Sequence, residues 1–262
     1  MPRPVDLLLQ NDLPAQSARR AGTVRAAMVA LALAAQTPAI AAGALQISPV
    51  IVNFPSAAGS ASVNITNQDA KATSVQVRVF RWTQADGEES LTPTQDIVAS
   101  PPIAAVAPGA TLTIRIIRSA AKTSPVEDAY RLVIDQLPSS DNTGRAQVSM
   151  LLRQVLPVFV GNPDAAKPEI AWRLARTPHG TVLRASNSGD RHIRIAKIVL
   201  ESPGHRPVAM GGGLLGYVLG RSEMSWPVPD RSLSPAGGAT VTVRGSADIG
   251  AINATALVAK SQ

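Results

Sequence analysis

Apolar and polar residues alternate in short segments along most of the chain from residue 45 onward. Segments 62–66, 75–80 and 111–117 each place apolar side chains at every second position, with polar side chains between them. Turn-forming pairs such as Asp86-Gly87 and Pro108-Gly109 separate the segments, and a helical period is not sustained. Alternation of this kind, with turn signals about every ten residues, predicts an all-β fold of the sandwich type.

Two longer segments, 130–137 and 147–160, flank the polar connection 138–145 and predict a hairpin. The second of these strands is unusually long and apolar. Gly161 to Asp164 then interrupts the pattern, and a further block of strands begins at Ile170. We therefore predict two sandwich domains, at residues 43–162 and 163–262. The strands expected in the second domain are 171–175, 181–185, 192–200, 214–219 and 240–244.

The N-terminal region has the three parts of a secretory signal. Arg19, Arg20 and Arg25 precede an apolar run at 26–35, and small residues follow at 39–42. The run is about ten residues long, too short for a helix to cross a bilayer core of about 30 Å. We predict a cleaved signal peptide over residues 1–42, and hence export without stable membrane insertion. An ordinary apolar N-terminal helix is the alternative.

The composition narrows the possible functions. The chain has no cysteine, which removes disulfides, thiol catalysis and cysteine-bound metals. Aromatic residues make up only 3%, so the cores must consist of Val, Ile, Leu and Ala. The formal net charge is +7, and removal of the signal region, with four basic and two acidic residues, lowers it to +5. The Lys and Arg residues are scattered without interleaved aromatics, so nucleic-acid binding is not predicted.

No pattern in the sequence indicates catalysis, a cofactor or a metal. The histidines at 179, 192 and 205 lack the spacing of metal ligands. Ser119 and Lys122 match a serine acylase motif, but its partner motifs do not accompany it. Gly211 to Gly213 lacks the following residues of a phosphate-binding loop. We predict a protein that is not an enzyme and has no cofactor.

An ordered set of segments resembles one known family. The first domain contains ISPVIVNF, ASVNITNQ, VQVRVFRW, TIRIIR and EDAYRL, and the second contains Trp172, Asn187-Ser-Gly189, 215–219 and 225–227. This set is similar to the periplasmic chaperones of pilus (fimbrial) assembly in the chaperone-usher pathway, most of all to their archaic or alternative branch. The resemblance implies two immunoglobulin-like β-sandwich domains in tandem, set at an angle.

The resemblance also implies a function. Such a chaperone stabilises pilus subunits in the periplasm by lending a β-strand to their incomplete sandwich, and then delivers them to an outer-membrane usher. Where the family has its donor strand, Val148, Met150 and Leu152 lie two residues apart, and we predict that they fill the groove of the subunit. The alternative is that these residues belong to the core of an ordinary buried strand.

The residues that anchor the subunit differ from those of the family. Classical members bind the C-terminal carboxylate of the subunit with an Arg and a Lys, at positions that align with Pro49 and Pro157 here. Arg131 and Arg153 lie nearest to the predicted donor strand, and a guanidinium can bind a carboxylate with two hydrogen bonds. They are the candidate anchors, and a structural or solvated arginine is the alternative for each.

Glu127 and Tyr130 are expected to have structural roles. The position of Tyr130 at the start of a strand resembles the tyrosine corner of sandwich domains. The family uses a Glu at position 127 in a polar contact between its two domains, but its Arg partner aligns with Gly161. A rival interpretation of the whole chain is an exported structural or adhesive module of the cell surface, in which segment 147–157 would be a closed, buried strand.

Overall fold

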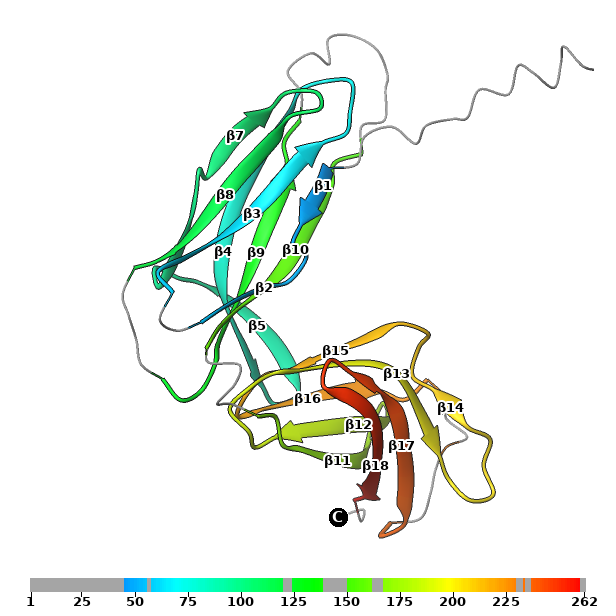
Figure 1. Cartoon of the computed structure of the whole chain (residues 1–262). Helices are drawn as coiled ribbons and strands as arrows, with labels where there is room; N and C mark the ends of the chain where they lie inside the picture. The colour runs from blue at the N-terminus through cyan, green and yellow to red at the C-terminus, as the bar shows by residue number, and fades with distance from the viewer. Residues whose placement is uncertain are drawn as a thin grey trace, which may run out of the picture. The chain divides into compact units, whose positions relative to one another are not determined.

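The computed structural model is built of β-strands (Figure 1). The predicted all-β class is confirmed, since every regular element of the described chain is a strand. The described part contains no helix long and apolar enough to cross a membrane. The predicted signal region lies outside the described residues, as does Val148. The structure describes residues 45–55, 58–119, 124–138, 150–161, 167–229, 233 and 237–259.

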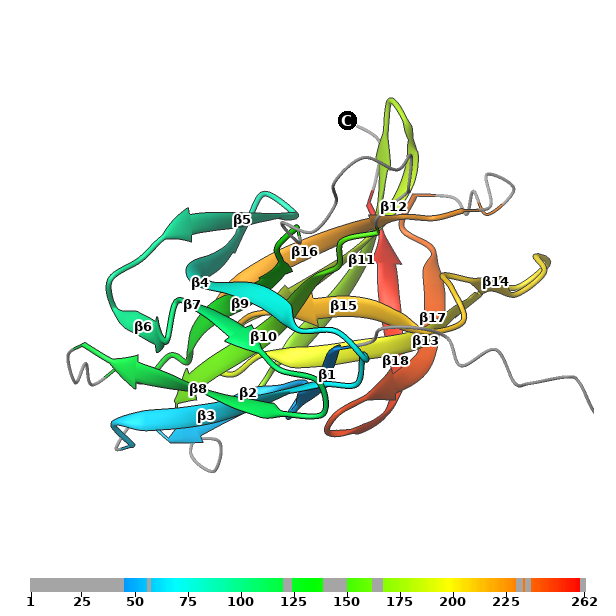
Figure 2. The same cartoon turned by 90° about the horizontal axis from the view of Figure 1, so that it is seen from above.

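The N-terminal strands form two sheets that face each other (Figures 1 and 2). One sheet has the order β1-β3-β8-β6, and the other has the order β2-β10-β9-β4-β5, with β7 paired to β4. We call these sheets A and B. Their strands are β1 (Leu45–Ser48), β2 (Val52–Pro55), β3 (Ser60–Asn67), β4 (Thr73–Ala85), β5 (Glu88–Pro93), β6 (Ile97–Ser100), β7 (Ile103–Val106), β8 (Thr111–Arg118), β9 (Asp128–Gln136) and β10 (Arg153–Gly161).

The alternating pattern explains why these segments become strands. Val63 and Ile65 of β3 point into the space between the sheets and are fully buried, as are Leu132 of β9 and Ile114 of β8. Burial of each such side chain stabilises the fold by about 1.5–3 kcal/mol. One core of aliphatic side chains therefore holds sheets A and B together.

The C-terminal strands form a third sheet, C, with the order β14-β13-β17-β18-β11-β12-β16 and with β15 paired to β13. It folds around a second apolar core that contains Leu174, Leu183 and Val243. The predicted strands of this block are present, but β14, β16 and β18 were not foreseen. The strands are β11 (Ile170–Thr177), β12 (Gly180–Asn187), β13 (Ile193–Glu201), β14 (Val208–Ala209), β15 (Leu214–Val218), β16 (Ser222–Pro227), β17 (Thr240–Ala247) and β18 (Gly250–Val258).

The strand predicted at 147–160 is shorter in the structure. β10 begins at Arg153, and residues 150–152 precede it without strand geometry. The physical reason is the neighbouring strand, since β9 ends at Gln136 and its last backbone bond toward this segment runs from Gln136 N to Leu152 O. An apolar segment without a partner strand cannot continue a hydrogen-bonded ladder. Whether the two domains divide near residue 163 stays a prediction.

Candidate functional site

One edge of β10 is open along its first half. Its pairing with β9 runs the full length, from Arg153 opposite Asp135 to Val160 opposite Asp128. On its other side, β2 pairs only with residues 158–161. No described strand pairs with that side of residues 153–157, so the backbone of the two exposed residues in this stretch, Arg153 and Val155, is available to another strand.

Apolar side chains accompany this edge. Met150 is 80% exposed, and Leu151, Leu152 and Val155 are between 39% and 45% exposed. By contrast, Leu156 is buried in the core between sheets A and B. We call residues 150–157 the open edge. Two of the three predicted donor residues, Met150 and Leu152, lie in it with exposed side chains.

The candidate anchor Arg153 belongs to an ion-pair cluster next to the open edge. Its Nε donates a hydrogen bond to Asp135 Oδ1, and Arg78 Nη2 donates to Asp135 Oδ2 over 2.6 Å. Desolvation alone would raise the pKa of the Asp135 carboxyl, but the two arginines outweigh it and lower that pKa. Asp135 is therefore a carboxylate at neutral pH, and the cluster carries one net positive charge.

The candidate anchor Arg131 occupies a different environment on the same sheet. It lies on β9 directly opposite Pro157 of β10. Its guanidinium stacks on Trp82, with 3.5 Å between the Cζ atom and the ring centroid, and its Nη2 lies 3.5 Å from a carboxylate oxygen of Glu89. Burial lowers the pKa of Arg131, although Glu89 acts against this shift. The side chain is a largely desolvated cation with one distant carboxylate partner.

Sheet B meets sheet C in a polar and aromatic junction. The buried side chain of Gln84 donates a hydrogen bond from Nε2 to Tyr217 O over 2.9 Å, and its Oε1 accepts one from Leu219 N over 2.8 Å. In the same place Gly87 O accepts hydrogen bonds from the backbone N and the hydroxyl of Ser225. Trp82, Ala129, Phe159, Tyr217 and Leu219 form a small apolar cluster around these contacts.

Gly87 fits this junction because it lacks a side chain. Its φ is 82°, in the left-handed region that favours glycine. A Cβ atom at this position would overlap the hydroxyl of Ser225. The Asp86-Gly87 turn between β4 and β5 is thus buried at its glycine, where the turn meets β16.

Glu127 also joins the two parts. Its Oε2 accepts a hydrogen bond from the backbone N of His192 over 3.1 Å and lies 2.5 Å from the ring Nδ1. The imidazole stacks on Phe159, with 3.5 Å between the ring centroids. A Cβ on Gly161 would lie 3.0 Å from Glu127 Cγ, so a side chain at this position would crowd Glu127. In this chain the polar partner of Glu127 is His192.

Tyr130 has a polar partner that differs from the expected corner. Its hydroxyl accepts a hydrogen bond from Arg81 Nη2 over 3.1 Å, and Arg81 in turn pairs with Asp96 and Asp128. Burial, followed by the charge of Asp128, raises the pKa of the Tyr130 hydroxyl to about 12. Tyr130 thus takes part in a partly buried ionic network that ties β9 to β4.

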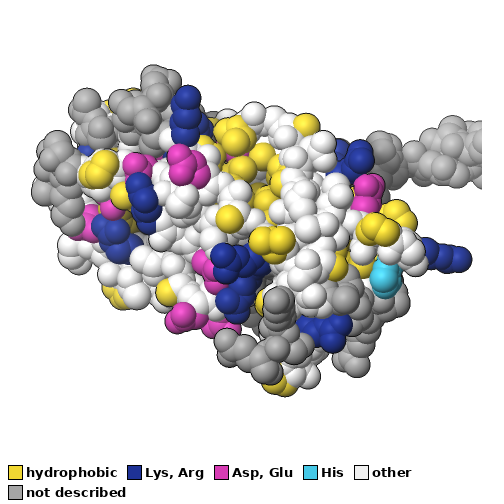
Figure 3. Space-filling model, turned by 90° about the horizontal axis from the view of Figure 1, so that it is seen from below, with side chains coloured by type: hydrophobic (Ala, Val, Ile, Leu, Met, Phe, Trp, Pro, Cys, Tyr) yellow, Lys and Arg dark blue, Asp and Glu magenta, His cyan; other side chains and the backbone are white. Residues whose placement is uncertain are grey.

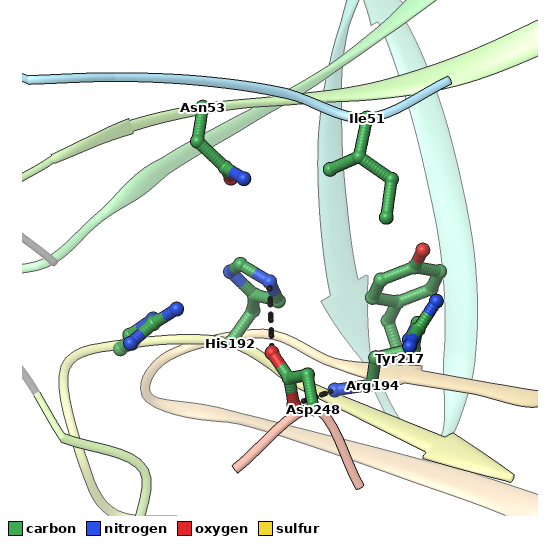
Figure 4. A pocket seen from close by; sticks show the side chains of 7 residues that line it. Ile51, Asn53, His192, Arg194, Tyr217 and Asp248 are labelled. Carbon is green, nitrogen blue, oxygen red and sulfur yellow. Dashed lines mark hydrogen bonds and ion pairs between the residues drawn. The ribbon is translucent and has the colours of Figure 1, made fainter. Parts of the chain in front are cut away.

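A cavity of about 210 Å³ opens beside the junction (Figure 4). His192 and Tyr217 line it from sheet C, and Ile51 and Asn53 line it from the segment around β2. Asp248 accepts a hydrogen bond from Arg194 N over 3.0 Å and lies 3.8 Å from His192 Nε2. Among the residues that the structure describes, no group of three His, Asp or Glu could hold a metal ion.

The surface charges are mixed. In the view of Figure 3, basic side chains stand beside acidic ones and among apolar patches. Such mixing on this face differs from the continuous positive stripe that nucleic-acid binding requires.

The sequence did not reveal that Gln84, Gly87 and His192 belong to the junction. The partners of Gln84 lie more than 130 residues away along the chain, and local patterns hold no information about such pairs. One signal was present, because Trp82 occupies the polar face of the alternating strand β4 and yet is 1% exposed. A large apolar residue on the polar face indicates that something covers it.

Comparison with known proteins shows which proteins the chain resembles. Residues 44–167 match the model of the pili and flagellar-assembly chaperones, PapD N-terminal domain. The chain is 28% identical over 156 residues to YcbF of Escherichia coli K12, an uncharacterised fimbrial chaperone. This alignment covers 55% of the chain and 66% of YcbF, slightly less than two thirds of that relative.

Solved structures share the fold. One is a chain of the CsuC–CsuE chaperone and tip-subunit complex from the archaic Csu pili of Acinetobacter baumannii. Its sequence is 22% identical and the TM-score is 0.63, and the match covers 84% of this chain and 100% of that chain. Another is the CupB2 chaperone of Pseudomonas aeruginosa, with 16% identity, a TM-score of 0.53, and coverage of 81% and 100%. The predicted architecture of two sandwiches is confirmed. Over residues 44–167, slightly less than half of the chain, the sequence is similar to the pili and flagellar-assembly chaperones with a PapD-type N-terminal domain.

Proposed function

We propose that this protein is a periplasmic chaperone that binds incomplete pilus subunits by donor-strand complementation and delivers them to an outer-membrane usher. The observation that carries the proposal is the open edge, in which unpaired backbone groups accompany the exposed side chains of Met150, Leu152 and Val155. Exposed strand edges invite pairing with another chain. An apolar open edge therefore suits a protein whose task is to pair with one.

A subunit that lacks one strand of its sandwich has an apolar groove between two unpaired edges. A lent strand satisfies the backbone along the groove and places every second side chain in its pockets. Met150 and Leu152, with Val148 outside the described residues, have this spacing. Leu151 and Val155 are odd-numbered, so in an extended strand they point to the face opposite Met150 and Leu152. The register of the donated segment therefore depends on which of these two sets enters the groove.

Arg131 and Arg153 are the proposed anchors for the C-terminal carboxylate of the subunit. Arg131 lies opposite Pro157, where the family has its lysine, and its existing partner Glu89 is 3.5 Å away. A desolvated guanidinium is stabilised by a carboxylate that accepts two charge-assisted hydrogen bonds from it. Arg153 already bonds Asp135, so the geometry supports Arg131 as the principal anchor.

The proposed cycle needs no catalysis. Assembly chaperones are a non-enzymatic class, and release requires only that the strand of a neighbouring subunit replaces the donated strand. The predicted signal peptide is the basis for the periplasmic location. The rival interpretation, a structural or adhesive surface module, expected a closed strand over 147–157, and the open edge counts against it.

Co-expression of the full chain with the subunits encoded beside it tests the proposal. Leu152→Asp and Met150→Asp place a charge in the apolar groove, and we expect the yield of soluble complex to fall about a hundredfold or more. Leu91→Asp on β5 is the matched control, because Leu91 is 44% exposed away from the open edge. Full subunit binding by both edge variants would refute the proposed function.

A further inference from the structure

A groove of about 460 Å³ lies directly beside the open edge. Its floor crosses three strands of sheet B, because Gln76 of β4 is opposite Asp135 of β9, which is opposite Arg153 of β10. Leu151 and Leu152 form one wall. The groove thus joins apolar side chains of the open edge to the ion-pair cluster.

The cluster is asymmetric in charge and in exposure. The side chain of Asp135 is 13% exposed, whereas those of Arg78 and Arg153 are 42% and 64% exposed. Each oxygen of the carboxylate binds one arginine. The acidic group is therefore enclosed, and both cationic groups are accessible from the groove.

One carboxylate cannot satisfy two guanidinium groups. Each guanidinium has five N–H donors, and Asp135 uses one from each arginine, Nη2 of Arg78 and Nε of Arg153. The pKa of Asp135 is lowered, so it remains ionised and the net charge of the cluster stays at one positive unit at neutral pH. A second carboxylate would neutralise this charge and would form charge-assisted hydrogen bonds.

We propose that this groove binds an acidic side chain of the pilus subunit, an Asp or Glu that follows or precedes an apolar residue. The apolar residue would contact Leu151 and Leu152, and the carboxylate would bind between Arg78 and Arg153, while the C-terminal carboxylate of the subunit would bind at Arg131, the principal anchor. The inference rests on the proposed function, since it requires a subunit at the open edge. It adds a contact that depends on the subunit sequence, whereas a C-terminal carboxylate is common to every chain.

The test compares affinities of the full chaperone for the subunit encoded beside it, at low and high salt. Arg78→Gln should weaken binding by about three- to tenfold and should reduce its salt dependence. Asp135→Asn should have the opposite effect and tighten binding by about two- to fivefold, because it removes the carboxylate that competes for the two arginines. Arg115→Gln is the control, since Arg115 is an exposed arginine on sheet A.

The opposite signs distinguish a binding site from a structural cluster. If Asp135→Asn weakens binding as much as Arg78→Gln does, or if Arg78→Gln changes nothing, the inference is wrong.

Failure of this inference and failure of the proposed function have different signatures. If Leu152→Asp abolishes binding while Arg78→Gln has no effect, only the groove assignment fails. If Leu152→Asp and Met150→Asp both leave binding intact, the proposed function itself fails. Urea midpoints of all variants establish that each one is folded. Arg78→Gln should perturb the fold less than Asp135→Asn, because the Arg78 side chain is partly exposed.

Discussion

Replacement of Gln84 by alanine would remove two hydrogen bonds that connect sheet B to sheet C. The amide donates to Tyr217 O and accepts from Leu219 N, over 2.9 and 2.8 Å. Gln84 is 7% exposed, and Tyr217 and Leu219 are each 6% exposed. In the variant, a buried carbonyl and a buried N–H would both lose their partner.

The expected loss follows from these two groups. A buried polar group without a partner costs about 1–3 kcal/mol, so two cost about 2–6 kcal/mol. Water that enters the space left by the side chain would recover part of this cost. We therefore expect the free energy of unfolding to fall by about 2–4 kcal/mol, a large fraction of the 5–15 kcal/mol typical of a domain.

Urea unfolding of residues 43–262, followed by tryptophan fluorescence and circular dichroism, measures this loss. Residues 43–262 form one compact unit, and we expect the wild type to unfold in a single transition. Gln84→Ala should lower the midpoint or separate the fluorescence and dichroism transitions. Gln76→Ala is the control, on the same strand but away from the junction. If Gln84→Ala kept the wild-type midpoint and slope, the junction would not depend on this amide.

Three further predictions concern single residues. Gly87→Ala should destabilise the chain by about 1–3 kcal/mol, because residue 87 has a positive φ and the new Cβ would overlap the Ser225 hydroxyl. Ser225→Gly in the same chain removes that overlap, so it should recover the part of the loss due to the overlap and not the part due to the positive φ, in the same urea assay. The folded pKa of Tyr130, about 12, exceeds its ordinary value of 10.0. Its contribution to stability is therefore present below pH 10 and is lost as pH rises toward 12. Tyr130→Phe should flatten this alkaline decline in stability, and an unchanged decline would contradict the assignment. The pKa of Asp135 is lowered from 3.8, so its contribution is present above that pH and is lost as pH falls through the folded value; Asp135→Asn should flatten the acid limb of a stability profile.

Alternation predicted the strands whose inward residues are large and aliphatic. Val75 and Val77 of β4 are buried at every second position, and a pattern of this kind identifies a strand without knowledge of its neighbours. β18 was missed because its inward positions include the small residues Ala254 and Ala256, which contrast weakly with Thr255 between them. The strand exists because β17 and β11 pair with it on both sides.

The candidate site was predictable only where a local segment carries the signal. Met150 and Leu152 could be singled out because the resemblance fixed their place in the chain. The junction could not be foreseen, since Glu127 and His192 are 65 residues apart and each has an ordinary neighbourhood. A pattern search detects periodicity within a strand, whereas a contact between distant residues is decided by how the sheets pack.

β10 links the open edge to the junction, and its two halves have different physical tasks. Its second half is held on both sides, by β9 and β2, and Phe159 is buried between Trp82 and the imidazole of His192. Its first half pairs on one side only among the strands that the structure describes. A strand fixed at one end and open along the other presents its backbone in a single conformation, so a partner that pairs with it pays less conformational entropy than one that must order a free peptide. The junction and the open edge therefore lie on one strand, with Phe159 packed in the junction at one end and the open edge at the other.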